Sequence, residues 1–375
     1  MKIIYLVAGG RAGSDFFQGF LDGHSQILQF PGIINYGIFK IFKTDKAEEI
    51  AKKFIQYHPQ FFNSKQSGRE RHDRLGEKKN KFYKISKKKF IKEFNTLLKK
   101  KKITKYKIIK YLHLAYNYSS NQKKGRKKII FLHTHLYPFT KSLINFLNFK
   151  NTSIIFTYRH PVASISAAIK NWLKFKKGSS FFSRGYYFQL DSVMQGIPNL
   201  IGLKKKLYIV QLEKLHRENK KVIMDFCKIF KINYEKSMNK CTFHGHIWWG
   251  DSVSGKWLKG VNKNFTNKID TNIFFDRDIE FLENLCAKIM TKYKYENYKN
   301  KKNIFFNFLP MKSEILVWKN TFKHFSNRNL KFIIKSLIGI FFFYFKRIFF
   351  INKFNMKIQF FPYSLGSQKL KTNLK

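Results

Sequence analysis

The sequence predicts an α/β fold in which a central parallel sheet is flanked by helices. Four short runs, at residues 3–8, 128–134, 152–158 and 206–211, are almost entirely apolar, as expected of strands that are buried on both faces. A segment with helical periodicity follows each run, and strands that alternate with helices favour a parallel sheet. With 375 residues, 44% of them hydrophobic, the chain can bury a sizeable core.

The helices that follow the four strands are expected at residues 14–21, 136–147, 161–174 and 218–230. Pro161 supports the start of the third helix, because proline has the φ angle of a first helical turn and no N–H to leave unpaired.

Residues 40–127 are rich in lysine, have mostly helical periodicity and carry no chemical motif. We therefore predict a peripheral helical insertion at 40–127 within a domain of residues 1–310. Residues 311–375 are predicted to form a basic, aromatic C-terminal extension with a helix.

The stretch 332–351 in this extension is very apolar, but Lys335, Lys346 and Arg347 interrupt it. Its uninterrupted part, 336–345, is too short for a transmembrane helix. Basic flanks and aromatic side chains are typical of a helix that lies at a membrane surface. A terminal helix that packs on the domain is the alternative.

The net charge of +52 comes almost entirely from lysine, since only 11 of the 74 basic residues are arginine. Such a charge is typical of proteins that bind nucleic acid or anionic membranes. Because Phe, Ile and Asn are abundant too, we attribute much of the lysine to an AT-rich genome and predict no specific nucleic-acid partner. The three cysteines have no CxxC spacing, and the chain starts with a strand and not with a signal peptide. Both observations predict a cytoplasmic protein. With the apolar, basic stretch 332–351, we expect it to be peripheral at the inner membrane face.

A glycine-rich loop, "AGGRAGSD" at residues 8–15, follows the first strand. Glycines let several backbone N–H groups point at one anion, and a helix N-terminus adds its dipole. Ser14 can cap the helix and donate to a phosphate oxygen. The loop lacks both the GK[ST] of a Walker A loop and the GxGxxG of a dinucleotide fold. It predicts a phosphate or sulfate site with Arg11 at its lip; a tight turn with a solvated arginine is the alternative.

The third strand ends in a similar way, in "YRHPVASISAAIKNW" from Tyr158. Arg159 stands at the strand end, and Ser164 and Ser166 lie on the first turns of the next helix. An arginine and a serine in this place predict a second phosphate site, because the carboxyl ends of parallel strands share one sheet edge. A helix-capping arginine is the alternative.

These two stretches resemble the donor-binding elements of the sulfotransferases that use 3′-phosphoadenosine 5′-phosphosulfate (PAPS). The first is similar to the family's 5′-phosphosulfate loop, and the second to its 3′-phosphate element. Three weaker stretches agree in order and spacing across residues 3–260: "HTHLYP" from 133, "IVQLEKLHRENKK" from 209 and "DSVSGKWLKGV" from 251.

The resemblance implies an α/β fold of the P-loop-containing nucleotide-binding type. It also implies a sulfotransferase with PAPS as co-substrate, no metal, and a hydroxyl acceptor that we expect to be a glycan or glycolipid. Arg11 would neutralise charge on the bridging oxygen, and His135 would take the acceptor proton, a role that the pKa of histidine suits. The resemblance implies donor contacts from Gly10, Arg11, Ala12, Gly13, Ser14, Asp15, Arg159, Ser164, Ser166, Gly255, Lys256 and Trp257. Amides of residues 13–15 would hold the 5′-phosphate, and Arg159 with Ser166 the 3′-phosphate.

The chain departs from the family pattern in three places. Asp15 stands where Thr or Ser is usual, and His133 where many relatives have Lys. Ala167 holds the place of the family's second serine, so Ser166 is the expected ligand and Ser164 the alternative. His24 and His133 stay open as alternative bases.

Two other functions remain as alternatives. A P-loop kinase for a small metabolite fits the fold, although the loop lacks GK[ST]. A non-catalytic basic protein that binds nucleic acid or membrane fits the charge, although no arginine-rich, zinc-finger or RNA-recognition motif supports it. Whether adenosine 3′,5′-bisphosphate raises the melting temperature would separate the PAPS-dependent enzyme from the non-catalytic basic protein.

Overall fold

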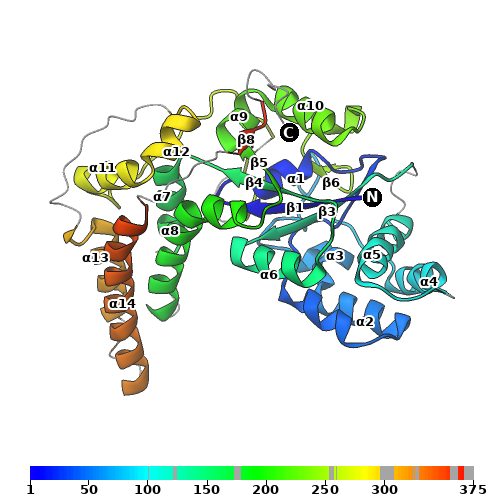
Figure 1. The fold of residues 1–375 in the computed structure, drawn as a ribbon, viewed down its shortest axis with the longest axis horizontal. Helices are drawn as coiled ribbons and strands as arrows, with labels where there is room; N and C mark the ends of the chain where they lie inside the picture. Colours follow the sequence, from blue (N-terminus) through cyan, green and yellow to red (C-terminus); the bar gives the residue numbers. More distant parts are fainter. Residues whose placement is uncertain are drawn as a thin grey trace.

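The centre of the fold is a six-stranded sheet with the strand order β2-β3-β1-β4-β5-β8 (Figure 1). The computed structural model describes residues 1–99, 101–120, 125–172, 179–252, 257–258, 260–295, 308–323, 325, 329–354 and 362–366. The strands are β1 (Lys2–Ala8), β2 (Ile27–Gln29), β3 (Ile129–His135), β4 (Thr152–Tyr158), β5 (Lys206–Gln211) and β8 (Tyr363–Ser364). Every pair in this sheet is parallel, so the predicted fold class is confirmed.

The position of β1 decides where the functional loops meet. β1 lies between β3 and β4, and all of its residues after Lys2 are buried. The loops that follow β3, β1 and β4 therefore emerge side by side at the carboxyl edge of the sheet. The sequence did not predict the edge strands β2 and β8, which have three and two residues and are too short to show a pattern.

Helices cover both faces of the sheet, with α9 and α10 on one side and α6 on the other (Figure 1). The bounds are α1 (Ser14–Gly19), α6 (Tyr137–Leu147), α7 (Pro161–Trp172), α8 (Ser179–Ile201), α9 (Leu212–Arg217) and α10 (Asn219–Phe230). α6 and α10 begin within one residue of their predicted starts. The prediction for α1 was wrong by two residues at its end, and residues 173 and 174 of the third predicted helix lie outside the described residues.

The lysine-rich insertion is helical at its two ends. Its elements are two 3-10 helices (Tyr36–Lys43 and Ser64–Gln66), α2 (Ala47–Tyr57), α3 (Pro59–Phe62), α4 (Lys87–Leu98) and α5 (Lys105–Ser119). Phe61 of α3 stacks on Phe30, which precedes the insertion, with ring centroids 5.1 Å apart. Buried aromatic rings of this kind attach the insertion to the sheet. Residues 67–86 contain no helix and form an irregular stretch between α3 and α4.

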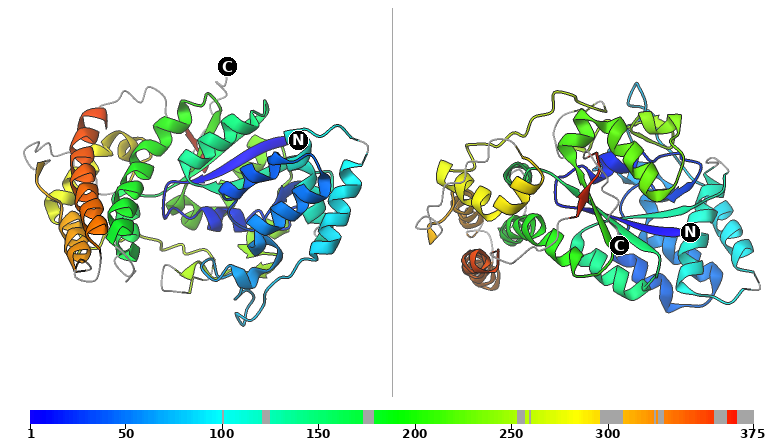
Figure 2. Two further views of the ribbon diagram at one scale, coloured as in Figure 1. Left: turned by 90° about the horizontal axis from the view of Figure 1, so that it is seen from below. Right: turned by 45° about the horizontal axis from the view of Figure 1, so that its top comes forward.

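The C-terminal part contains a small hairpin and four helices. The elements are β6 (Thr242–Phe243), β7 (His246–Ile247), α11 (Asp276–Leu285), α12 (Ala287–Lys292), α13 (Lys312–Phe322) and α14 (Leu330–Phe354). Figure 2 shows α13 and α14 side by side at one end of the molecule, next to α8. The division into a domain of residues 1–310 and an extension of 311–375 stays a prediction, and β8 of the extension pairs with β5.

Within the part of the chain that the structure describes, no helix has the length and apolar character needed to cross a bilayer.

Candidate active site at the carboxyl edge of the sheet

The loop after β1 has the backbone of an anion-binding turn. Gly10, Arg11 and Gly13 have φ angles of 70°, 44° and 75°, in the left-handed region. Among the described residues, no group accepts a hydrogen bond from the amides of residues 10–13, whereas the Gly9 amide donates to the Thr157 carbonyl at 2.8 Å. Consecutive free amides in such a turn form a concave site for an anion.

At two of these glycines a side chain would also meet a neighbouring side chain at short range. A Cβ at Gly10 would lie 2.0 Å from Nε2 of Gln189, and one at Gly13 would lie 2.5 Å from Cδ1 of Leu212. Gly13 is the N-cap residue of α1, and Ser14 is the first helical residue. The prediction that Ser14 caps the helix was therefore wrong; Ser14 is buried in the first turn.

Arg11 forms an ion pair with a residue far along the chain. Its Nη1 and Nη2 atoms donate to the two carboxylate oxygens of Asp251, at 3.0 and 3.4 Å. About a quarter of each side chain is exposed, so the pair stands at the surface of the site. The carboxylate holds the guanidinium beside the loop, where an anionic ligand would compete for it.

Two of the three departures from the family pattern, Asp15 and His133, lie against each other. His133 Nδ1 is 3.8 Å from Asp15 Oδ1. Burial, with smaller contributions from the charges of Glu70 and Asp251, raises the pKa of Asp15 to about 7. Burial also holds the pKa of His133 well below its usual range, so its imidazole is neutral. At neutral pH a large fraction of Asp15 is protonated, and a protonated carboxyl can donate a hydrogen bond as a hydroxyl does.

Gln18 determines which nitrogen of His133 carries the proton. The Gln18 amide nitrogen donates to the Phe30 carbonyl at 2.6 Å, which orients the amide. Its Oε1 therefore accepts from His133 Nδ1, at 2.9 Å. In a neutral ring the other nitrogen, Nε2, then bears a lone pair, and it is buried without a hydrogen-bond partner among the described residues.

His135 is the last residue of β3 and has an unusual backbone. Its φ angle is 61°, and the register of β3 against β1 shifts between its partners Leu6 and Val7. A residue other than glycine is strained when its backbone angles are left-handed, and such strain is common at functional sites. Burial, followed by the charges of Arg69 and Arg11, lowers the pKa of His135 to about 4. The neutral ring can accept a proton, and its Nδ1 is buried and unpaired within the described chain.

His24, the third candidate base, does not belong to the site. It precedes β2, whose first residue pairs with the first residue of β3. His24 therefore lies at the amino edge of the sheet, opposite to the loops. There its Nε2 contacts the Asn233 carbonyl at 2.8 Å.

The Arg159 element lies directly against the glycine loop. Ser164 Oγ donates to the Gly10 carbonyl at 2.6 Å and accepts from Gln189 Nε2 at 3.0 Å. Arg159 Nε donates to Asn267 Oδ1 at 3.2 Å. Ser166 Oγ accepts from the Asp270 amide at 3.0 Å. The structure therefore brings the two predicted phosphate elements together, with both serine hydroxyls bonded to neighbouring loops.

The buried acid Glu213 supports this element. Its Oε1 accepts from the His160 amide at 2.9 Å, and Oε2 is buried without a partner in the described residues. Burial raises the pKa of Glu213. Burial lowers the pKa of Arg159, against the opposite effect of the nearby Glu213 charge. Glu213 thus positions the residues at the end of β4.

Of the late-loop residues that the family resemblance implied, Trp257 is the one in the described chain, and Gly255 and Lys256 lie outside the described residues. The Trp257 ring packs under the guanidinium of Arg71, 3.9 Å from its centroid, and under Lys79. Trp257 therefore contacts the irregular stretch of the insertion.

The segment after the β6–β7 hairpin joins the insertion to the glycine loop. Trp248 Nε1 donates to the Glu70 carbonyl at 2.6 Å, and the Ser252 amide donates to the Arg69 carbonyl at 2.8 Å. Asp251, between them in sequence, binds Arg11. These contacts place residues 69–71 next to the loop that follows β1.

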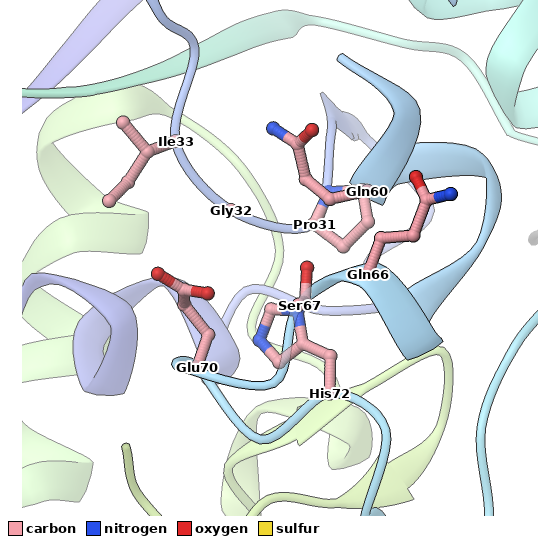
Figure 3. A pocket seen from close by; sticks show the side chains of 8 residues that line it. All are labelled: Pro31, Gly32, Ile33, Gln60, Gln66, Ser67, Glu70 and His72. Carbon is pink, nitrogen blue, oxygen red and sulfur yellow. The ribbon is translucent and has the colours of Figure 1, made fainter. Parts of the chain in front are cut away.

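A cavity of about 220 Å³ opens in this part of the insertion. Its lining is mostly polar: Pro31, Gly32, Ile33, Gln60, Gln66, Ser67, Glu70 and His72. Figure 3 shows the Ser67 and Glu70 side chains pointing toward the segment 31–33. Burial raises the pKa of Glu70, and the charge of Asp251 adds to this. The bonds from Trp248 and Ser252 to the carbonyls of Glu70 and Arg69 bring this cavity toward Asp251, the partner of Arg11.

Sequence reasoning missed the cavity, because its residues have no regular spacing and come from a stretch without helical periodicity. It also missed Gln18, Gln189 and Asp251, which act through contacts far along the chain. Within the described residues, no cluster of three or more His, Cys, Asp or Glu side chains could hold a metal ion.

No family model and no curated protein sequence matches this chain. Among solved structures, it is similar to the sulfotransferase domain of a Synechococcus olefin synthase, with 12% identity over 84% of this chain and 93% of that domain and a TM-score of 0.39. It is similar to the sulfotransferase domain of the curacin biosynthetic pathway (12% identity, 85% and 96% coverage, TM-score 0.39). It is also similar to a sulfotransferase of Mycobacterium avium (8% identity, 80% and 78% coverage, TM-score 0.39).

Proposed function

We propose that this chain transfers a sulfuryl group from PAPS to a hydroxyl group of a carbohydrate or glycolipid. The proposal rests above all on one observation. The glycine loop after β1, the Arg159 element after β4 and His135 at the end of β3 lie at one edge of the sheet, on three neighbouring strands. The first two are the stretches that resemble the donor-binding elements of the sulfotransferases.

The residues of the loop and of the Arg159 element, here called the donor side, suit PAPS. The sequence pointed to the amides of residues 13–15 for the 5′-phosphate. We propose instead the amides of residues 10–13, which have no acceptor among the described residues, and the Arg159 guanidinium for the 3′-phosphate. PAPS supplies an activated sulfuryl group when it is bound. Arg11 would exchange its bond to Asp251 for one to the oxygen that becomes negative as the S–O bond to adenosine 3′,5′-bisphosphate breaks.

His135 would act as the base. The acceptor hydroxyl loses its proton to a ring nitrogen of His135 while its oxygen forms the new bond to sulfur. The low pKa of His135 keeps the ring unprotonated before the reaction. The nearby positive charge of Arg11 lowers the pKa of His135, and the negative charges of a bound donor would raise this pKa again.

The cavity lined by residues 31–33 and 60–72, here called the acceptor side, supports a polyhydroxylated acceptor. Two amides, a hydroxyl and an imidazole line it, and such groups recognise sugar hydroxyls by hydrogen bonds. Glu70 is the acid among the lining residues. A carboxylate there disfavours an anionic acceptor, so we propose a neutral sugar ring at this place in spite of the basic surface of the protein.

The donor proposal is tested by calorimetric titration with adenosine 3′,5′-bisphosphate and with AMP. We expect micromolar binding of the bisphosphate and at least tenfold weaker binding of AMP, because AMP lacks the group that Arg159 would hold. Arg159→Ala should remove this preference. Arg126→Ala is the matched control, since Arg126 is exposed and precedes β3 at the opposite sheet edge. Equal binding of both nucleotides, or equal losses in both variants, would contradict the proposal.

The acceptor proposal is tested by sulfation assays on neutral and carboxylated sugars of the same size. Glu70→Gln should lower the preference for the neutral sugar by about tenfold, the expected effect of one unit charge at close range. Glu77→Gln removes an exposed acid from the same stretch and should leave the preference unchanged. An unchanged preference in Glu70→Gln would place the acceptor elsewhere.

A further inference from the structure

The helix α14 carries a row of large apolar side chains on its solvent side. These side chains are between 48% and 70% exposed, and they are Leu330, Ile334, Ile338, Phe341, Phe342 and Phe345. Soluble proteins rarely expose so many large apolar groups together. The row therefore marks a contact surface.

The spacing of these residues places them on one face. At about 100° per residue, the six side chains fall within an arc of about 120° around the helix. Ser336 and Ile340 lie outside this arc and are buried. α14 packs on α8, and Figures 1 and 2 show it at the end of the molecule, away from the sheet. One face of α14 thus packs against the rest of the protein, and a second, apolar face is exposed.

The exposed charged side chains that the structure describes on α14 are both positive. Lys331 and Lys335 are exposed, and at 100° per residue they lie along one border of the apolar arc. Residues 315–375 contain 12 lysines and arginines and no aspartate or glutamate. An apolar stripe bordered by lysine complements a surface that is apolar inside and anionic outside.

We propose that the exposed face of α14 binds the surface of an anionic lipid bilayer, with the helix axis in the membrane plane. The apolar row would lie among the acyl chains near the headgroups, and Lys331 and Lys335 would contact lipid phosphates. A second copy of this chain fits the face less well, because a symmetric contact would bring the same lysines together. This inference does not depend on the proposed sulfuryl transfer.

Flotation of the full-length chain with lipid vesicles tests the proposal. The vesicles contain phosphatidylcholine alone or with about one third phosphatidylglycerol, at about 0.1 M salt, where charges still act over about 10 Å. We expect binding to the anionic vesicles. Ile338→Ser combined with Phe342→Ser should weaken it at least tenfold, since both side chains are exposed and their loss leaves the core intact. Met224→Ser, at an exposed apolar residue of α10, should leave binding unchanged.

Two double charge-reversal variants distinguish binding through this face from binding through the net charge of the protein. Lys331→Glu with Lys335→Glu should weaken binding to anionic vesicles several-fold. Lys88→Glu with Lys92→Glu makes the same charge change at the same spacing on α4 and should have little effect. Equal losses in the two double variants, or no loss in the Ile338 and Phe342 variant, would overturn the proposal. The proposal would also be overturned if light scattering showed a dimer, and if the α14 variants dissociated this dimer without changing vesicle binding.

Discussion

The donor side and the acceptor side of the candidate site are built in different ways. The donor side consists of short turns between regular elements, and its residues are fixed by close contacts such as the bond from Ser164 to the Gly10 carbonyl. The acceptor side is an irregular stretch around a cavity, fixed by bonds from Trp248 and Ser252 to the carbonyls of Glu70 and Arg69. The first set of contacts is tight and leaves no space for another methyl group, whereas the second leaves room for a ligand.

This difference explains why one kind of site can be recognised in a sequence and the other cannot. A turn between a strand and a helix has a fixed set of backbone angles, so its glycines and arginine can be recognised from the chain alone. A cavity depends on which distant segments pack around it. Three predictions test this difference, beginning with the largest expected effect.

Acid should disrupt both sides at once. Burial lowers the pKa to about 3 for His72 and to about 4 for six others, His58, His113, His135, His160, His216 and His244. A lowered pKa stabilises the folded state above the unfolded pKa near 6.5, and this stability is lost as the pH falls toward the folded value. At pH 5 the loss is about 2 kcal/mol for each histidine, and the sum is comparable with the 5–15 kcal/mol of a typical domain.

We therefore expect unfolding near pH 5. In a variant with Phe at positions 172, 257 and 318, the fluorescence of Trp248 and Trp249 reports on the acceptor side, because both indoles bond to carbonyls of the insertion. Far-UV circular dichroism reports on the whole fold. Coincident transitions would mean that the two sides unfold as one unit, and a fluorescence change at higher pH would show that the acceptor side opens first.

Adding a methyl group should lower the free energy of unfolding more in the glycine loop of the donor side than in an open turn elsewhere. Gly13→Ala puts a Cβ 2.5 Å from Leu212 Cδ1 at a φ angle of 75°. Gly245→Ala is the matched control, since Gly245 has the same φ and nothing within 4 Å of its Cβ. We expect a cost of about 1 kcal/mol for the control and about 3 kcal/mol for Gly13→Ala. Urea unfolding measures both; equal costs would mean that the loop can move away from Leu212.

The smallest effect concerns the charge of Asp15. Its raised pKa means that the contribution to stability is present at low pH and is lost as the pH rises through about 7. Between pH 6 and pH 8 the wild type should lose about 1 kcal/mol relative to Asp15→Asn, which has no such titration. Bisphosphate should also bind Asp15→Asn more tightly than the wild type at pH 8, where the wild-type carboxylate repels it.

Chemical unfolding at the two pH values measures the first effect, and calorimetry measures the second. Asp276→Asn, at an exposed acid in the first turn of α11, serves as the control. A parallel pH dependence in the wild type and in Asp15→Asn would show that Asp15 is ionised throughout this range.

The sequence by itself determined the parallel sheet, its four long strands and the two loops with Arg11 and Arg159. These features depend on neighbours within a few residues, such as the apolar run of a strand and the glycines of a turn. Because the strands are parallel, the loops that follow them meet at one edge of the sheet.

Only the tertiary structure decided how these residues are paired. It placed His133 beside Asp15, Asp251 on Arg11 and His24 at the opposite edge, and it showed that one face of α14 packs on α8 while another stays exposed. It also formed the cavity around Glu70 from segments that share no pattern. Such contacts join residues tens to hundreds of positions apart, and they depend on the shapes of packed side chains, which no local periodicity encodes.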